Sequence, residues 1–258
     1  MGDKEVKELL NRLQMRVAAI LGAQFIGLYL YGSLAAGDFN AASSDVDFVV
    51  VTRGSLAADT VATLETMHRE LWASDAKWAA KLEGSYIPLA DLRQYDPAGG
   101  PFPQVNEQRF FVSGHGRDWV IQRYMLREHG AVVAGPPIRP FIDPVTPEQM
   151  VRAVQAVLND WWAGMLDNPS RLAGREYQAY AVLTMCRARY MLREGAIVSK
   201  PDAVRWALAN LDGRWRLLIE RAARWPAPPQ SDDLAETLDF IRETLAASQE
   251  WQESGFGG

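Results

Sequence analysis

The sequence predicts an N-terminal domain of mixed helices and strands followed by an all-helical domain. Up to Asp143, short runs of β-branched and aromatic residues alternate with segments whose apolar residues recur at helical spacing. Beyond it, the apolar spacing is helical almost to the end of the chain. We therefore expect an α+β domain over residues 1–145 and a helical bundle over residues 146–258.

The expected first domain opens with a helix whose apolar residues repeat at helical spacing. Helices are predicted over 3–21, 56–73 and 117–128, and strands over 25–31, 46–52 and 81–88. The stretch 95–109 holds three prolines and two consecutive glycines, so we expect it to be a loop. The run Ala134-Gly135-Pro136-Pro137 is expected to break the chain before the second domain begins.

A helix start marks the beginning of the second domain. Thr146-Pro147-Glu148-Gln149 supplies an N-cap, a proline at the first helical position and a glutamine three residues after the cap. The predicted helices cover 147–165, 175–193, 201–210, 214–224 and 233–250. Aromatic residues recur along them, Tyr180 among these, and we interpret them as bundle core.

Composition narrows the class of protein. With 258 residues, 48% hydrophobic and 23% charged, the chain has the composition of a soluble globular protein. The net charge of -5 argues against the basic surface expected of a nucleic-acid binder and favours a small cationic substrate. One cysteine excludes a disulfide framework, and no apolar run is long enough to span a membrane. We expect a cytoplasmic monomer without nucleic-acid or membrane partners.

The most informative motif joins the first two predicted strands. The first ends in Gly32-Ser33, and the second opens on Asp45 and Asp47 after an eleven-residue insert. Because residues i and i+2 of a strand share a face, the two carboxylates project together, which favours a bound cation such as Mg²⁺. Gly32 lets a phosphate approach the backbone, and the Ser33 hydroxyl can donate to it. The pattern indicates nucleotidyl transfer; the alternative is an acidic turn exposed to solvent.

A third carboxylate, Glu83, lies in the middle of the otherwise apolar third strand. A charged residue in a core strand is costly unless it is paired or lies in a solvated site. If this strand lies beside the one that carries Asp45 and Asp47, Glu83 reaches the same pocket and can complete a metal site or accept a proton. A glutamate on a solvent-exposed strand face explains the pattern equally well.

These residues resemble two nested families. Gly-Ser followed by Asp-x-Asp is similar to the signature of the polymerase-β-like nucleotidyltransferases, which have a mixed sheet with helices. Over most of its length the chain also resembles the streptomycin/spectinomycin adenylyltransferases, which add a C-terminal helical domain. That likeness rests on Leu30-Tyr31-Gly32-Ser33, Ser44-Asp45-Val46-Asp47, Leu82-Glu83, Val182-Leu183-Thr184-Met185-Cys186-Arg187 and Val198-Ser199-Lys200-Pro201.

The resemblance implies a role for each matching position. Asp45 and Asp47 match the Mg²⁺-binding pair, and Glu83 matches the catalytic base. The residues that match contacts to ATP are Gly32, Ser33, Ser44, Arg187, Lys200 and, through a gapped alignment, Trp225. The residues alone are less specific. Ser199 caps the predicted helix that begins at Lys200, and a lysine there is unfavourable for the helix dipole unless an anion binds. A solvated lysine and a salt-bridged arginine remain the alternatives for Lys200 and Arg187.

The acceptor side departs from the streptomycin enzymes. Their helical domain holds the drug with a tryptophan and acidic residues just before the arginine-bearing helix. Here the corresponding segment, 168–177, has no tryptophan, and Glu176 is its only acid. The expected acceptor contacts are therefore Glu176, Tyr177, Glu83 and an aromatic residue, Phe110 or Phe111. We expect spectinomycin or another amino-alcohol to fit better than streptomycin.

The resemblance thus implies Mg²⁺-dependent transfer of AMP from ATP to a hydroxyl of a small cationic acceptor, as in antibiotic resistance. Two other interpretations remain open at this point. One is a nucleotidyltransferase that modifies a protein or an RNA, as toxin–antitoxin modifiers do. The other is a nucleotide-binding regulator without catalysis.

Overall fold

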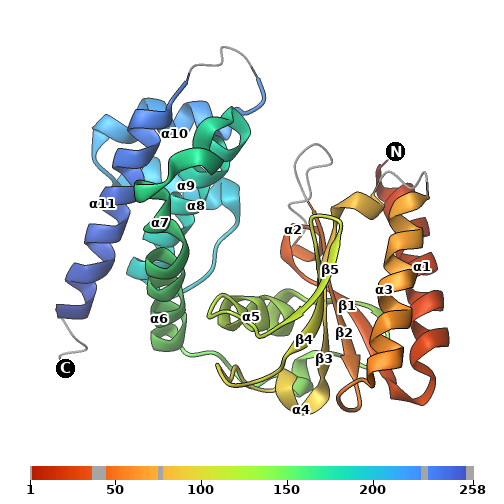
Figure 1. The fold of residues 1–258 in the computed structure, drawn as a ribbon. Coiled ribbons are helices and arrows are strands. Elements are labelled where there is room, and N and C mark those ends of the chain that lie inside the picture. The colour runs from red at the N-terminus through yellow and green to blue at the C-terminus, as the bar shows by residue number, and fades with distance from the viewer. Residues whose placement is uncertain (1, 37–44, 75–77, 228–231, 254–258) are drawn as a thin grey trace. The chain divides into compact units, whose positions relative to one another are not determined.

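The computed structural model describes residues 2–36, 45–74, 78–227 and 232–253. The chain divides into two compact units, residues 1–145 and residues 146–258. The first unit combines a sheet with helices and the second consists of helices, as the ribbon in Figure 1 shows. This order confirms the predicted α+β domain followed by a helical domain.

The described part of the first unit contains a six-stranded mixed sheet with the order β5-β4-β3-β2-β1-β6. Strands β2 and β3 run parallel, and every other neighbouring pair is antiparallel. The strands are β1 (Phe25–Leu30), β2 (Val46–Thr52), β3 (Leu82–Pro88), β4 (Phe102–Asn106), β5 (Arg109–Ser113) and β6 (Ala131–Ala134). The parallel pair lies at the centre of the sheet, so neither of its strands is an edge strand.

Helices cover both faces of this sheet (Figure 1). Helices α1 (Gly2–Leu21) and α3 (Ala58–Ala73) pack on one face, where Leu13 and Leu64 are fully buried against alternate residues of β1, β2 and β3. Each such leucine contributes about 1.5–3 kcal/mol through burial. The other face is approached by α5 (Trp119–His129), and the short helices α2 (Gly32–Ala36) and α4 (Leu89–Leu92) follow β1 and β3.

Strands β4, β5 and β6 correct the sequence-based prediction. The region 95–109 was expected to be a loop, but its second half forms β4, the turn after it and the first residue of β5. Proline is tolerated because β4 pairs with β3 only through Gln104 and Val105, so Pro103 is not needed as a donor to β3. The hairpin turn uses Glu107 and Gln108 at positive φ, without the Asn-Gly or Asp-Gly signal that reveals such turns in a sequence.

The second unit begins with the predicted capping box. The Thr146 hydroxyl accepts from the Gln149 amide, and the Gln149 side chain accepts from the Thr146 amide. The helices are α6 (Pro147–Val157), continued by a π-turn (Leu158–Trp162) and α7 (Gly164–Asp167), then α8 (Arg175–Glu194), α9 (Lys200–Asn210), α10 (Arg216–Ala223) and α11 (Leu234–Glu253). Helix α8 contacts all the longer helices of the unit and forms its centre.

A buried ion-pair network ties α11 to its neighbours. Asp233, just before α11, is 4% exposed and contacts Arg175 of α8 at 2.7 Å and Arg221 of α10 at 3.0 Å. Near the start of α10, Arg214 likewise pairs with Glu243 of α11, so its charge is also neutralised within the unit. Across the described ranges of the chain, no helix is long and apolar enough to cross a membrane.

Candidate active site

The candidate site is built on the two parallel central strands. Asp47 of β2 is the register partner of Glu83 of β3. Partners in a ladder share a face, and the burial of β2 alternates accordingly: Val46 and Phe48 turn to the helical core of α1 and α3, whereas Asp47 turns the other way. The carboxylates of Asp47 and Glu83, which belong to two different strands, are therefore neighbours.

A cationic side chain accompanies them. Asp45 lies immediately before β2, and Lys81 ends the 3-10 turn η2 (Ala79–Lys81) immediately before β3. The Lys81 Nζ lies 3.2 Å from Asp45 Oδ1. The charges of Asp45, Asp47 and Lys81 all act on Glu83, so the four side chains form one cluster at the start of the two strands.

Gly32 brings the end of β1 against this cluster. Its φ of +66° lies in the left-handed region, and a Cβ at this position would overlap the Asp47 carboxylate. The neighbouring Tyr31 amide donates to the Asp47 carbonyl at 3.2 Å. Ser33 follows as the second residue of α2 and is partly exposed. Glycine is thus required both by the backbone angle and by the closeness of the carboxylate.

Glu83 has the electrostatics of a proton acceptor. Burial raises the pKa of its carboxyl to about 7, with further increases from Asp45, Asp47 and Glu107 and an opposing contribution from Lys81. A carboxyl group with a pKa near neutrality can both accept a proton from a hydroxyl and release it again, as a general base must. An exposed surface glutamate would have neither the burial nor the acidic neighbours.

The carboxylates fit a metal ion that shares its ligands with a nucleotide. Within the described ranges, no group of three or more His, Cys, Asp or Glu side chains is arranged to bind a metal by itself. Mg²⁺ commonly takes only one or two carboxylates from the protein and completes its shell with phosphate oxygens and water. Asp45 and Asp47, both partly exposed beside the Gly32 turn, suit that kind of site.

The sequence reasoning missed Tyr31, which closes the other side of this cluster. Tyr31 is 6% exposed, and its ring centroid lies 6.4 Å from that of Trp119 in α5. Burial and the charges of Asp47, Glu83 and Asp118 raise the pKa of the Tyr31 phenol well above its usual value. Its position directly before Gly32 was the available signal. For Lys81, the signal was the i, i−2 spacing from Glu83.

The strand register distinguishes the two candidate phenylalanines. Phe110 contacts His68 of α3, at 5.8 Å between ring centroids, and packs against the α1/α3 core. Phe111 pairs with Gln104, and Gln104 pairs with Ser85 on the face that carries Glu83. The geometry therefore does not support acceptor binding by Phe110, and it makes Phe111 the aromatic candidate on the carboxylate face.

In the second unit, α8 presents a further set of candidates. Tyr177, Tyr180 and Arg187 are spaced by three and seven residues and so share one side of the helix. The Lys200 ammonium lies 5.8 Å from the Tyr180 ring centroid, and Tyr180 is 45% exposed rather than part of the expected core. Sequence spacing alone did not distinguish Tyr180 from the buried aromatics.

The remaining candidates lie elsewhere in the chain. Glu176 is exposed in the first turn of α8. Trp225 is partly buried in the turn after α10, where its amide donates to the Ala222 carbonyl. Ser44 lies outside the described residues. Asp45, Asp47 and Glu83 belong to the first unit, whereas Arg187 and Lys200 belong to the second.

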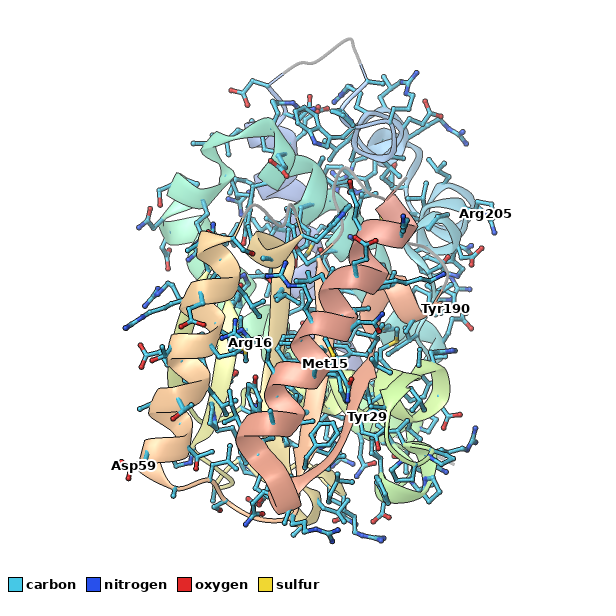
Figure 2. All side chains as sticks on the ribbon, turned by 90° about the vertical axis from the view of Figure 1, so that its right-hand side faces the viewer. Met15, Arg16, Tyr29, Asp59, Tyr190 and Arg205 are labelled. Atoms are coloured by element: carbon cyan, nitrogen blue, oxygen red, sulfur yellow. The ribbon has the colours of Figure 1, made fainter. Side chains whose placement is uncertain are left out.

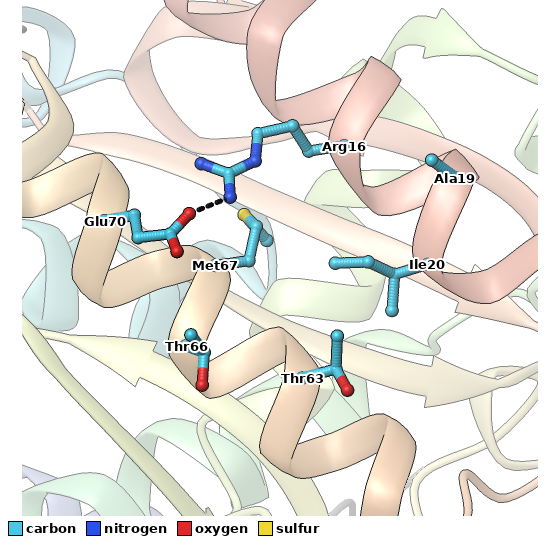
Figure 3. Close-up of a pocket in the computed structure, with 7 residues that line it drawn as sticks. All are labelled: Arg16, Ala19, Ile20, Thr63, Thr66, Met67 and Glu70. Carbon is cyan, nitrogen blue, oxygen red and sulfur yellow. Dashed lines mark hydrogen bonds and ion pairs between the residues drawn. The ribbon is translucent and has the colours of Figure 1, made fainter.

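A surface pocket of 270 Å³ between α1 and α3 is separate from this chemistry. Figure 3 shows its lining, with Arg16 of α1 paired to Glu70 of α3 and Met67 beside them. Met15 and Arg16 are adjacent on α1 (Figure 2), and Met15 is exposed. Because α1 and α3 cover the face of the sheet opposite to Asp47 and Glu83, this pocket is not the candidate active site.

Comparisons with known proteins agree with the geometry of both units. Residues 7–88 match the nucleotidyltransferase domain family, and residues 141–249 match the C-terminal domain of aminoglycoside adenylyltransferases. Among curated proteins, the chain is similar to aminoglycoside (3'') (9) adenylyltransferases from Rhizobium radiobacter, 28% identical over 133 residues, and Klebsiella pneumoniae, 31% identical over 126 residues. These matches cover 50% and 49% of the chain, but the chain spans only 45% of the length of either relative.

A solved structure supports the fold over nearly the whole chain. The spectinomycin adenyltransferase AAD(9) from Enterococcus faecialis, with ATP and spectinomycin, superposes with a TM-score of 0.71 at 17% identity. The match covers 93% of this chain and 98% of that one. The chain therefore joins, in the expected order, a region that matches the nucleotidyltransferase domain family to a region that matches the C-terminal domain of aminoglycoside adenylyltransferases, and it shares its fold with a solved spectinomycin adenyltransferase.

Proposed function

We propose that this protein transfers AMP from Mg·ATP to a hydroxyl of a small cationic aminocyclitol, with spectinomycin as the preferred test substrate. The observation that carries the proposal is the pairing of Asp47 with Glu83 across two parallel strands, beside the Gly32 turn. In this proposal Asp47 holds a metal, and Glu83, whose pKa is raised to about 7, accepts a proton.

In the proposed reaction, the acceptor hydroxyl oxygen attacks the α-phosphorus of ATP and pyrophosphate leaves. Glu83 accepts the hydroxyl proton as the new O–P bond forms, so that a neutral alcohol does not have to act as the nucleophile. Asp45 and Asp47 hold Mg²⁺ against the triphosphate. The metal, when bound, neutralises negative charge on the phosphates and on the leaving pyrophosphate.

Basic residues of the helical unit complete the nucleotide site in this proposal. Arg187 and Lys200 contact phosphate oxygens, Ser33 and Ser44 donate hydroxyl hydrogen bonds, and Trp225 lies near the nucleotide. Support comes from their match to family positions and from the placement of Lys200 at the first residue of α9, where a bound anion offsets an otherwise unfavourable charge. The helical unit then closes over nucleotide and acceptor.

The acceptor is proposed to bind through Glu83, Glu176, Tyr177 and Phe111. Glu176 supplies a negative charge for an ammonium group, and the two aromatic rings supply apolar surface for a sugar-like ring. The net charge of -5 favours a cationic ligand. Spectinomycin is preferred over streptomycin because the segment before Arg187 lacks the tryptophan and most of the acids of streptomycin enzymes.

Order of binding and cellular setting follow from the same scheme. The nucleotide contacts residues of both units and so binds first, and the acceptor pocket is complete only afterwards. We propose a monomer that acts in the cytoplasm, where ATP and Mg²⁺ are available. Modification of a protein or an RNA, and nucleotide sensing without catalysis, are the alternatives that the experiment below separates.

The test measures pyrophosphate release from Mg·ATP with spectinomycin, streptomycin, other aminocyclitols, a protein mixture and total RNA, each followed by mass spectrometry of the acceptor. The expected result is metal-dependent AMP attachment to an aminocyclitol, faster with spectinomycin than with streptomycin. Labelling of protein or RNA alone would support the first alternative. Nucleotide binding with no transfer to any acceptor would support the second.

A further inference from the structure

Lys81 is a cationic feature of the carboxylate cluster that the proposed reaction leaves unexplained. Its ammonium lies 3.2 Å from Asp45 Oδ1, although both side chains are more than a third exposed. An ion pair at that exposure adds little to stability, on the order of 0–1 kcal/mol, so folding alone is a weak reason for it. Its location is specific, because it pairs with a carboxylate that is expected to bind metal.

The charges around Lys81 explain the pairing. Asp45, Asp47 and Glu83 cluster at the start of β2 and β3, and three neighbouring carboxylates repel one another unless a cation is present. Lys81 also interacts with Glu83, whose pKa it lowers. The lysine therefore supplies part of the positive charge that a divalent metal supplies in the loaded site.

We propose that the Lys81 ammonium pairs with Asp45 in the nucleotide-free protein and pairs instead with a phosphate oxygen when Mg·ATP binds. This inference rests on the proposed function. Lys81 is a positioning residue here: it keeps Asp45 oriented on the strand face while the site is empty, and it is released when the metal takes over that carboxylate. The flexible four-carbon stem of lysine allows such a change of partner without backbone movement.

The proposal predicts that removal of Lys81 has effects of opposite sign on metal affinity and on nucleotide affinity. Without nucleotide, Lys81 competes with a divalent cation for Asp45, so its removal strengthens metal binding. With nucleotide, Lys81 adds a favourable contact to phosphate, so its removal weakens Mg·ATP binding. A lysine with a purely structural role would change neither affinity, and a lysine that only attracts phosphate would change the second alone.

The experiment compares wild type with Lys81→Met, Lys81→Arg and the control Lys4→Met, whose side chain is exposed on α1. Mn²⁺ alone is titrated with detection of the free ion by electron paramagnetic resonance, and Mg·ATP binding is measured by calorimetry. For Lys81→Met we expect about three- to tenfold tighter Mn²⁺ binding and about three- to tenfold weaker Mg·ATP binding, as for loss of one charge contact at a partly exposed site. Lys81→Arg should remain close to wild type in both.

A double-mutant cycle with Asp45→Asn assigns the effect to this pair. In the Asp45→Asn background, the Lys81→Met change should strengthen Mn²⁺ binding by less than it does in the wild-type background, because only the weaker interaction of Lys81 with Glu83 remains. Mn²⁺ affinity that is unchanged or weaker in Lys81→Met, or Mg·ATP affinity that is unchanged or tighter, overturns the proposal. Failure of the proposed function is distinguishable, because it appears in the wild type as the absence of metal-dependent nucleotide binding, whatever residue occupies position 81.

Discussion

Asp47 and Glu83 are register partners on the two parallel strands at the centre of the sheet, and the glycine turn after β1 approaches the same carboxylates. This relationship gives two acids of the same type different surroundings. Asp47 lies against the Gly32 backbone, where a phosphate would be bound. Burial of Glu83, together with its acidic neighbours, raises the pKa of that carboxyl to about 7.

The raised pKa of Glu83 makes stability depend on pH. Between its ordinary value of 4.5 and about 7, the folded protein keeps the proton that the unfolded chain releases, so stability is lost as pH rises through this window. Glu83→Gln should therefore be more stable than wild type at pH 8, by on the order of 1–2 kcal/mol, and nearly equal to it at pH 4. Urea denaturation at both pH values, with Glu8→Gln as an exposed control, measures the difference. Equal gains at both pH values would contradict the assignment.

Gly32→Ala should abolish nucleotide binding by the folded protein, an effect that the loss of stability alone does not explain. The positive φ costs an alanine about 1–2 kcal/mol, and the added methyl group would overlap the Asp47 carboxylate. Gly54→Ala is the matched control, because its added methyl group meets no atom within 4 Å. Calorimetry with Mg·ATP on both folded variants provides the comparison. Wild-type affinity in Gly32→Ala would show that the nucleotide does not approach this turn.

Phe110 and Phe111 form a matched pair that tests which sheet face binds the acceptor. Phe111→Ala should raise the KM for the acceptor by about tenfold with little change in Tm, as for loss of one ring contact. Phe110→Ala should lower stability by about 1–3 kcal/mol through lost packing against His68 and leave the KM unchanged. Steady-state kinetics and thermal unfolding of both variants separate the two roles, and a reversed pattern would place the acceptor on the α1/α3 face.

The buried Asp233 network predicts a large structural effect in the helical unit. Asp233→Ala removes the shared partner of Arg175 and Arg221; Arg221 still pairs with Glu236, whereas Arg175 loses its carboxylate and keeps a hydrogen bond to Gln178. A loss of about 3–5 kcal/mol is expected for breaking a buried pair in this way. Asp239→Ala, which removes only an exposed pairing with Arg242, should change stability by less than about 1 kcal/mol. Similar effects of the two substitutions in denaturation curves would argue against a structural role for the network.

The sequence predicted those parts of the fold whose signal is local. Helical spacing from Val6 to Leu21 and the capping box at Thr146 were sufficient to place α1 and α6, and the Gly32–Asp47 motif indicated the candidate site. Strand β4 was not predictable, because its proline, Pro103, is tolerated only where the ladder to β3 ends. Strand β6 was hidden for a related reason: its four residues end just before the Gly135-Pro136 break, and only pairing with β1 makes them a strand.

Within the site, the residue types were predictable but their partners were not. Asp45, Asp47 and Glu83 were identified from spacing and resemblance. The choice of Phe111 over Phe110 depends on the register of β4 with β3 and β5, which a sequence does not encode locally. The pairing of Lys81 with Asp45 likewise requires that the starts of β2 and β3 be adjacent.

The division of labour between Asp47 and Glu83 is the central claim, and one paired measurement tests it most directly. Asp47→Asn and Glu83→Gln are each examined for Mg·ATP affinity by calorimetry and for single-turnover AMP transfer to spectinomycin. Asp47→Asn should lose metal-dependent nucleotide binding. Glu83→Gln should bind Mg·ATP nearly as wild type does, yet transfer AMP at least about a hundredfold more slowly, as for loss of a general base. Undiminished Mg·ATP binding by Asp47→Asn, or near wild-type transfer by Glu83→Gln, would contradict the account.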